Sequence, residues 1–300
     1  MPGRKEATSS AKAFSMNFRI GLTAAAALSP VALAHAADAP SAIHGFGILN
    51  IQNDYITPRG LMVTNKGVTV QVIAGLVFDL YHPSDSAIDD VSFVVGTFND
   101  IDSTQHANTA GAWNEFDWFA GPSFHFEKNW NLDVQIGQFL SPPGNFKAET
   151  NLEFALSYDD SGWGLPLLFK PYVKLFYALS GDSTVVTGRR GGTFDVEIGA
   201  APSISIAPFT LSSPTWITVG PETFWGGGGN VGVFSTGLTL TYPLPIPTPL
   251  GHWNAKAGFQ YYNFINDRLR LAQMLIGTAT PGSGGHRDEV NGFVGLSFGF

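Results

Sequence analysis

The chain of 300 residues contains no cysteine, and charged residues make up only 13% of it. The absence of cysteine excludes disulfide frameworks, thiolate metal sites and cysteine nucleophiles. The charged share is about half of the roughly 25% found in ordinary globular proteins. Long apolar runs of about 20 residues are also missing, which excludes a bundle of transmembrane helices. The 24 Phe, 7 Trp and 8 Tyr exclude a disordered chain, so apolar residues must be dispersed one by one among polar ones.

The N-terminal segment has the composition of a secretory signal peptide. Basic residues lie at positions 4, 5, 12 and 19, an apolar stretch covers 20–33, and Ala34-His35-Ala36 supplies the small residues that a signal peptidase reads. A membrane anchor is the alternative, but the stretch is short and rich in Ala. We expect a signal peptide over 1–36 and one β-barrel domain over 37–300. Because 1–36 hold 4 of the 16 basic residues and one acid, the mature chain is strongly acidic, which excludes nucleic-acid binding by counterion release.

Apolar and polar side chains alternate through the mature chain, without a sustained helical period. In the last ten residues Val294, Leu296, Phe298 and Phe300 share one face, whereas the other face is mostly small or polar. Twelve segments show this alternation to differing degrees: 44–56, 69–81, 91–100, 115–126, 131–136, 152–159, 171–179, 193–200, 212–221, 230–242, 253–261 and 291–300.

The alternation fits either a soluble sandwich or a membrane barrel. A sandwich exposes a polar face rich in long charged side chains, whereas here that face favours Gly, Ser, Asn and isolated acids, which suit a narrow lumen. Twelve segments leave about 22 residues for each strand with its connection, enough for a spanning strand of about 10 residues. We therefore predict an all-β fold: a transmembrane antiparallel up-and-down β-barrel of about 12 strands.

The connections predict the topology. An even strand number places both termini on the periplasmic side, with longer loops outside. The tight turn 127–129 is then periplasmic, and 266–288 and 101–110 are external loops. The Pro-rich connector 243–249 falls on the periplasmic side, where it is longer than expected. The glycine run 226–229 is predicted to be a turn, because it lacks the Lys of a nucleotide-binding loop.

The alternation also assigns charged residues to the lumen. Rings of acidic side chains favour cations in a narrow pore, so we expect a channel for small polar or cationic solutes. The alternative is that these acids lie at strand ends or pair with the two lysines inside a closed barrel. The candidates are Asp79, Glu115, Asp117, Asp133, Glu153, Asp159, Asp195, Glu197, Lys174 and Lys256.

Other kinds of site have weaker signals. Ser123 and His125 lie on one face with Asp133 across the next turn, which would suit a hydrolase, but no glycine elbow accompanies them. Asp85, Asp89 and Asp90 lack the EF-hand pattern, so a solvated turn is the better interpretation. We expect no enzyme activity, no metal and no cofactor.

The signal peptide, the alternating strands and the final strand ending in Phe300 resemble Gram-negative outer-membrane β-barrels. The resemblance implies an outer-membrane location and recognition of Phe298 and Phe300 by the barrel-assembly machinery. Segment 53–60, Asn-Asp-Tyr-Ile-Thr-Pro-Arg-Gly, looks like the opening signature of TorF-type porins in the first strand, with one extra residue before Arg59.

The resemblance implies a porin-like channel for passive diffusion, with lipid, lipopolysaccharide and small solutes as partners. The alternatives are a non-conducting structural or ligand-binding barrel and an outer-membrane hydrolase. Arg189 and Arg190, in an expected external loop, could contact lipopolysaccharide phosphates, although a solvated basic turn is the simpler interpretation.

Overall fold

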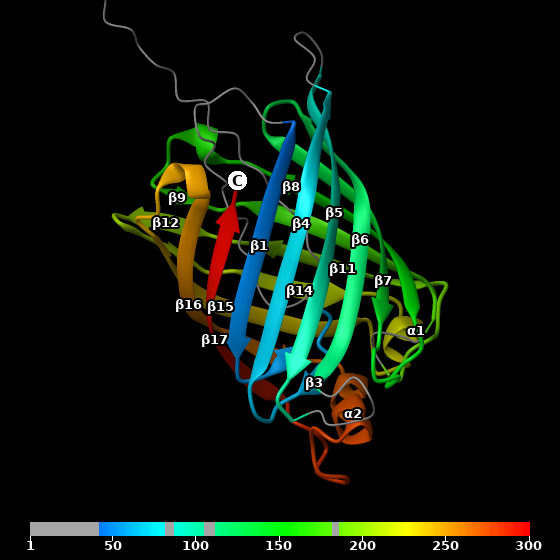
Figure 1. Cartoon of the computed structure of the whole chain (residues 1–300). Helices are drawn as coiled ribbons and strands as arrows, with labels where there is room; N and C mark the ends of the chain where they lie inside the picture. The colour runs from blue at the N-terminus through cyan, green and yellow to red at the C-terminus, as the bar shows by residue number, and fades with distance from the viewer. Residues whose placement is uncertain (1–41, 82–86, 105–111, 182–185) are drawn as a thin grey trace, which may run out of the picture.

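Twelve strands form the wall of a barrel in the computed structural model, which describes residues 42–81, 87–104, 112–181 and 186–300 (Figure 1). The expected signal peptide lies outside the described residues. The wall strands are β1 (Ile43–Gln52), β4 (Thr69–Tyr81), β5 (Ile88–Asp102), β6 (Trp113–Phe126), β7 (Trp130–Leu140), β8 (Glu149–Tyr158), β10 (Pro171–Ser180), β11 (Thr193–Ala200), β14 (Thr215–Val219), β15 (Val231–Pro243), β16 (His252–Phe264) and β17 (Asp288–Gly299).

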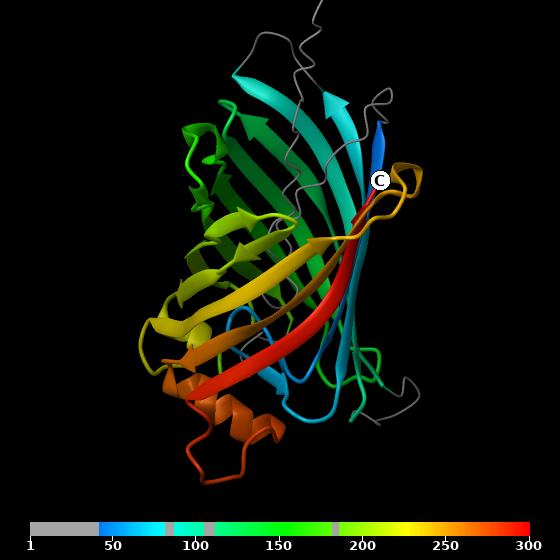
Figure 2. The same ribbon diagram turned by 90° about the vertical axis from the view of Figure 1, so that its left-hand side faces the viewer.

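The barrel is closed, because every wall strand pairs with an antiparallel neighbour on each side. The first strand, β1, pairs with β4 and with the last strand, β17. The ring closes between β14 and β15, where Trp216 lies opposite Ser235. Each of the twelve predicted segments overlaps one wall strand, which confirms the predicted fold class and strand number. Figure 2 shows the same barrel after a quarter turn.

The two faces of the wall differ as the alternation predicts. On β17, Val294 is 54% exposed on the outer face, whereas Asn291 and Ser297 on the inner face are buried. On β4, Leu76 and Leu80 point outward, and Gln71 is buried inside. The outer face is therefore apolar, and the inner face collects the polar side chains.

The wall is irregular where three strands are interrupted near one end. β9 (Leu167–Leu168) precedes β10, β12 (Ser203–Ile206) follows β11, and β13 (Phe209–Ser212) precedes β14. Pro202 and Pro214 lie at two of these breaks, where proline lacks the N–H that a continuous ladder needs. β13 continues the pairing of β14 along β15, and β12 and β9 extend that small sheet.

Both ends of the described chain lie at one end of the barrel, which we call the terminal end; the opposite end is the loop end (Figures 1 and 2). The turn 127–129 lies at the terminal end, as predicted, and so does 244–251 with η2 (Thr248–Leu250). β5 continues through Asp102, so the loop expected over 101–110 begins later; residues 105–111 lie outside the described part.

Two helices at the loop end were not predicted. α1 (Glu222–Trp225) precedes the glycine run 226–229, and α2 (Asp267–Ile276) occupies the loop expected over 266–288. Asn266 begins α2 by accepting a hydrogen bond from the Arg268 N–H at 2.8 Å, as an N-cap does. Within the described ranges no helix has the length and apolarity to cross a membrane.

The C-terminal aromatic residues cover the seam between the first and last strands. A Cβ on Gly45 would lie 2.2 Å from the Phe300 ring, and one on Gly47 would lie 2.2 Å from the Phe298 ring. The Phe298 ring also stacks on Trp253, with centroids 4.7 Å apart. The rings therefore occupy the space that the glycines leave open on the outer face.

Substitution of Gly121 tests how closely β6 and β7 pack against each other. A Cβ there would lie 1.9 Å from the Val134 carbonyl oxygen, which belongs to the backbone and cannot rotate away. We expect Gly121→Ala to lower the free energy of unfolding by about 1–3 kcal/mol. Urea titration of the refolded barrel measures this. Gly292→Ala is the matched control, because its Cβ would meet ordinary contacts at 3.6 Å; equal stability of the two variants would contradict this packing.

Candidate functional site

The inner face of the wall carries most of the charged residues that the sequence assigns to it. Asp79, Glu115, Asp117, Asp133, Glu153, Asp195, Glu197, Lys174 and Lys256 all stand on inward positions of their strands. Lys174 Nζ lies 3.2 Å from Glu197 Oε1, so one of the predicted lysines does pair with a wall acid. Near the terminal end, His44 Nε2 lies 2.8 Å from Asp79 Oδ2.

Asp159 lies just beyond the wall strand on which the alternation placed it. β8 ends at Tyr158, so Asp159 belongs to the connection at the terminal end. Its backbone N–H donates to the Asn129 carbonyl at 2.7 Å, and its Oδ1 accepts a hydrogen bond from the Ser161 N–H at 3.1 Å, at the start of η1 (Ser161–Trp163). The apolar–polar alternation of the sequence extends one residue beyond β8. Nothing in the sequence marks Tyr158 as the end of that strand.

Three further buried acids line the lumen and were not predicted: Asp100, Asp102 and Glu149. Asp100 lies directly opposite Glu115 across the β5–β6 pair. Asp100 lies within the predicted strand 91–100, two residues beyond the inward Phe98, so the alternation was a usable signal for it, whereas Asp102 lies beyond the predicted end. Nine buried acids on the wall strands therefore outnumber the cations around them: Asp100, Asp102, Glu115, Asp117, Asp133, Glu149, Glu153, Asp195 and Glu197.

The loop between β1 and β4, residues 53–68, folds into the loop end of the barrel, and we call it the inward loop. It contains β2 (Tyr55–Ile56) and β3 (Met62–Thr64), which pair with each other and not with the wall. The first-strand assignment of segment 53–60 was therefore wrong, since β1 ends at Gln52. The Trp216 indole N–H on β14 donates to the Pro58 carbonyl at 3.2 Å.

Arg59, carried by the inward loop, is the cation nearest to several wall acids. Its Nη2 donates a hydrogen bond to Glu153 Oε1 at 3.3 Å, and its Nε lies 3.3 Å from Asp195 Oδ1. Its guanidinium carbon lies 3.4 Å from the centroid of the Phe176 ring, a cation–π arrangement. In the ring of twelve strands β10, which bears Phe176, is opposite β1, so the inward loop crosses the lumen.

Tyr55 provides a second contact between the inward loop and the acidic wall. Its hydroxyl donates to Glu115 Oε2 at 2.8 Å, and both side chains are buried. The Tyr55 ring packs at 6.0 Å from Phe98 on β5. The loop is therefore attached to the wall on two sides, at Glu115 and at the Glu153–Asp195 pair.

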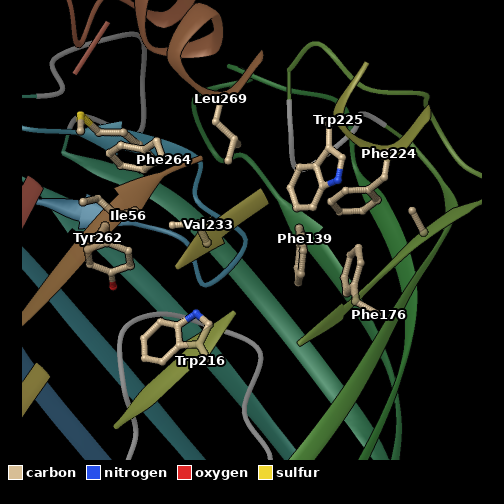
Figure 3. Close-up of a cluster of buried hydrophobic side chains, with 12 residues drawn as sticks. Ile56, Phe139, Phe176, Trp216, Phe224, Trp225, Val233, Tyr262, Phe264 and Leu269 are labelled. Atoms are coloured by element: carbon tan, nitrogen blue, oxygen red, sulfur yellow. The ribbon is translucent and has the colours of Figure 1, made fainter. Parts of the chain in front are cut away.

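Buried apolar side chains close around the inward loop at the loop end (Figure 3). Phe224 and Trp225 of α1 face Phe139 and Phe176 of the wall, and the Phe224 and Phe176 rings meet edge to face at 6.2 Å. The cluster extends from β7 to β16, which are opposite strands in the ring. Its other members are Ile56, Met62, Ala178, Trp216, Val233, Tyr262, Phe264 and Leu269.

The residues considered for catalysis have separate partners. The Ser123 hydroxyl donates to Asn131 Oδ1 at 3.2 Å, whereas His125 Nδ1 lies 3.7 Å from Asp89 Oδ2. Asp89 also accepts a hydrogen bond from the Lys128 backbone N–H. Within the described part of the chain, no three His, Asp or Glu residues gather as a metal site; Asp85 lies outside it.

The buried hydrogen bond from Tyr55 is tested by Tyr55→Phe. The substitution keeps the ring but leaves the buried Glu115 carboxylate without this donor, so we expect a loss of about 1–3 kcal/mol of unfolding free energy. Tyr261→Phe is the matched control, because Tyr261 donates to an exposed acceptor, Asp288, at 2.5 Å; it should change stability by less than about 0.5 kcal/mol. Equal effects in urea titrations would contradict a buried Tyr55.

The inward loop also predicts a pH dependence. Burial and the nearby Glu289 carboxylate raise the pKa of Asp54 from 3.8 to about 6, although a hydrogen bond from Asn53 opposes the shift. A raised carboxyl pKa contributes stability that is complete below the unfolded value and is lost as the pH rises through the folded one. Asp54→Asn should therefore raise the urea midpoint relative to the unsubstituted chain above about pH 7 and not at about pH 3.5. An equal change in the urea midpoint at both pH values would contradict the raised pKa of Asp54.

Comparisons with known proteins identify no family. No family model matches the chain, and no curated protein does, so the likeness of segment 53–60 to TorF-type porins remains a prediction. Among solved structures, an outer membrane channel from Pseudomonas putida F1 aligns at 10% identity and a TM-score of 0.46, over 87% of this chain and 97% of that one. Outer membrane phospholipase A from Escherichia coli aligns at 14% identity and a TM-score of 0.42, over 84% and 92%. Structural alignments with identities and TM-scores this low do not show the function. We therefore infer the function from the barrel itself.

Proposed function

We propose that the chain is an outer-membrane β-barrel that works as a porin-like channel for passive diffusion of small polar or cationic solutes. The observation that carries the proposal is the division of one closed wall into an apolar outer face and an acidic inner face. An apolar band outside suits lipid, and closure leaves no unpaired strand edge in the hydrocarbon. In this orientation the terminal end is periplasmic, and the loop end faces outward.

The charge inside favours cations. Nine buried wall acids face the lumen with Lys256, Lys174 and Arg59 as the counter-charges around them. Fixed carboxylates along a narrow path attract cations and repel anions. The selectivity should therefore follow the wall acids.

The orientation of the barrel in the membrane also suggests the partners that each part of the chain would contact. Lipid contacts the outer face, and small solutes enter the lumen. Arg189 and Arg190 lie exposed at the loop end, where lipopolysaccharide phosphates would be in reach. Phe298 lies near the end of the last strand and Phe300 directly follows it, where the assembly machinery would recognise them.

A non-conducting or ligand-binding barrel is the second candidate, and one observation favours it. The inward loop and the apolar cluster join opposite strands at the loop end, so the described conformation is a restricted one. A channel then requires the inward loop to move. Electrical recording separates the two candidates, because a non-conducting barrel passes no current under any ionic condition.

Planar-bilayer recording in a KCl gradient tests the channel. We expect a reversal potential of the sign for cation preference, reduced in Asp133→Asn, which removes one buried inner charge at nearly constant volume. Asp159→Asn is the matched control, since Asp159 lies in the connection after β8 and not on a wall strand. Anion preference, or an equal shift in both variants, would contradict the proposed selectivity; absence of current would contradict the channel.

A further inference from the structure

We infer that Glu153, Asp195 and the face of Phe176 form a guanidinium-binding subsite in the permeation path. Arg59 occupies the subsite in this structure, and solutes that bear a guanidinium group compete with it. The inference rests on the proposed channel function and names a solute class for it. It also assigns a role to the inward loop: Arg59 holds the loop across the lumen until another cation takes its place.

The subsite is shaped for a flat cation. Glu153 on β8 and Asp195 on β11 flank β10, which carries Phe176 between them. The Arg59 guanidinium lies on the Phe176 ring at 3.4 Å while both carboxylates are within ion-pair distance. An aromatic face with two carboxylates beside it suits a flat guanidinium better than a compact ammonium. The ammonium of Lys174 pairs instead with Glu197.

Arg59 itself fits this subsite incompletely. Its contact to Asp195 has the distance of an ion pair, but Nε and Asp195 Oδ1 both lack an aligned hydrogen bond, and the two residues are 5% and 2% exposed. The contact to Glu153 is a single long hydrogen bond of 3.3 Å. A guanidinium can form two parallel bonds to a carboxylate when it is free to orient. A guanidinium without a tether can therefore bind these carboxylates in a better geometry than Arg59.

The turn that carries Arg59 is held by its own backbone hydrogen bonds. The Thr57 N–H donates to the Leu61 carbonyl at 2.8 Å, and the Gly60 N–H donates to the Thr57 carbonyl at 2.9 Å, so the turn that carries Arg59 is closed internally. The Trp216–Pro58 hydrogen bond is neutral. Displacement of Arg59 thus breaks the charged attachment while the turn stays intact.

Recording from Arg59→Ala with added guanidinium tests the subsite directly. We expect a larger conductance than in the unsubstituted channel, because the inward loop loses its charged attachment. Millimolar guanidinium chloride should then bind the vacated carboxylates and reduce the current. Urea, its neutral isostere, should bind about tenfold more weakly, the ratio that one charge-assisted hydrogen bond supplies.

Two further variants complete the test. Arg59→Ala combined with Glu153→Gln and Asp195→Asn also removes the two carboxylates that Arg59→Ala alone would leave without their cation, which protects folding. This triple variant should lose the block by guanidinium while staying open. Arg287→Ala removes an exposed arginine of another loop and should leave conductance unchanged. Equal block of Arg59→Ala by guanidinium and urea, block that persists in the triple variant, or unchanged conductance of Arg59→Ala would overturn the subsite. Folded channels without current in any variant would instead overturn the proposed function.

Discussion

Complete pairing of the backbone is the constraint on which this structure depends. A strand in hydrocarbon has no water to satisfy its N–H and C=O groups, so the sheet must close on itself. Pairing of β1 with β17 and of β14 with β15 achieves that closure. Once the ring is closed, a period of two residues sends every second side chain to lipid and the others to the lumen. The breaks at Pro202 and Pro214 lie where β12 and β13 leave the ring, so the ring itself stays paired.

Closure of the strand ring brings acidic side chains together in the lumen. These carboxylates need positively charged groups nearby. Burial of an unpaired carboxylate is costly, and two lysines of the wall cannot serve nine acids. The inward loop delivers Arg59 to Glu153 and Asp195 on the far side of the lumen. Its apolar residues then join side chains of α1, α2 and the wall in one buried cluster. The loop is thus both an electrostatic partner of the wall and part of a buried apolar core at the loop end.

The wall could be predicted from the sequence because its signal is local. Strand alternation repeats every two residues, so twelve segments suffice to give the fold, the strand number and the inner face. The inward loop could not be predicted, because Arg59 and Glu153 are 94 positions apart and nothing near either residue marks the contact. α2 was missed because its ten residues follow a strand and lie in a polar loop. Asp159 and Asp102 show that alternation alone does not fix where a strand ends.

Accessibility of the inward loop tests most directly the claim that it is folded into the barrel. The chain has no cysteine, so single cysteines at Met62, which is fully buried in the loop, and at Ser283, which is exposed at the loop end, can be compared without further substitution. A charged, membrane-impermeant maleimide should modify Ser283→Cys rapidly and Met62→Cys far more slowly in the folded protein. Equally rapid modification of both in the folded protein would show that the loop lies outside the lumen, and would contradict this account.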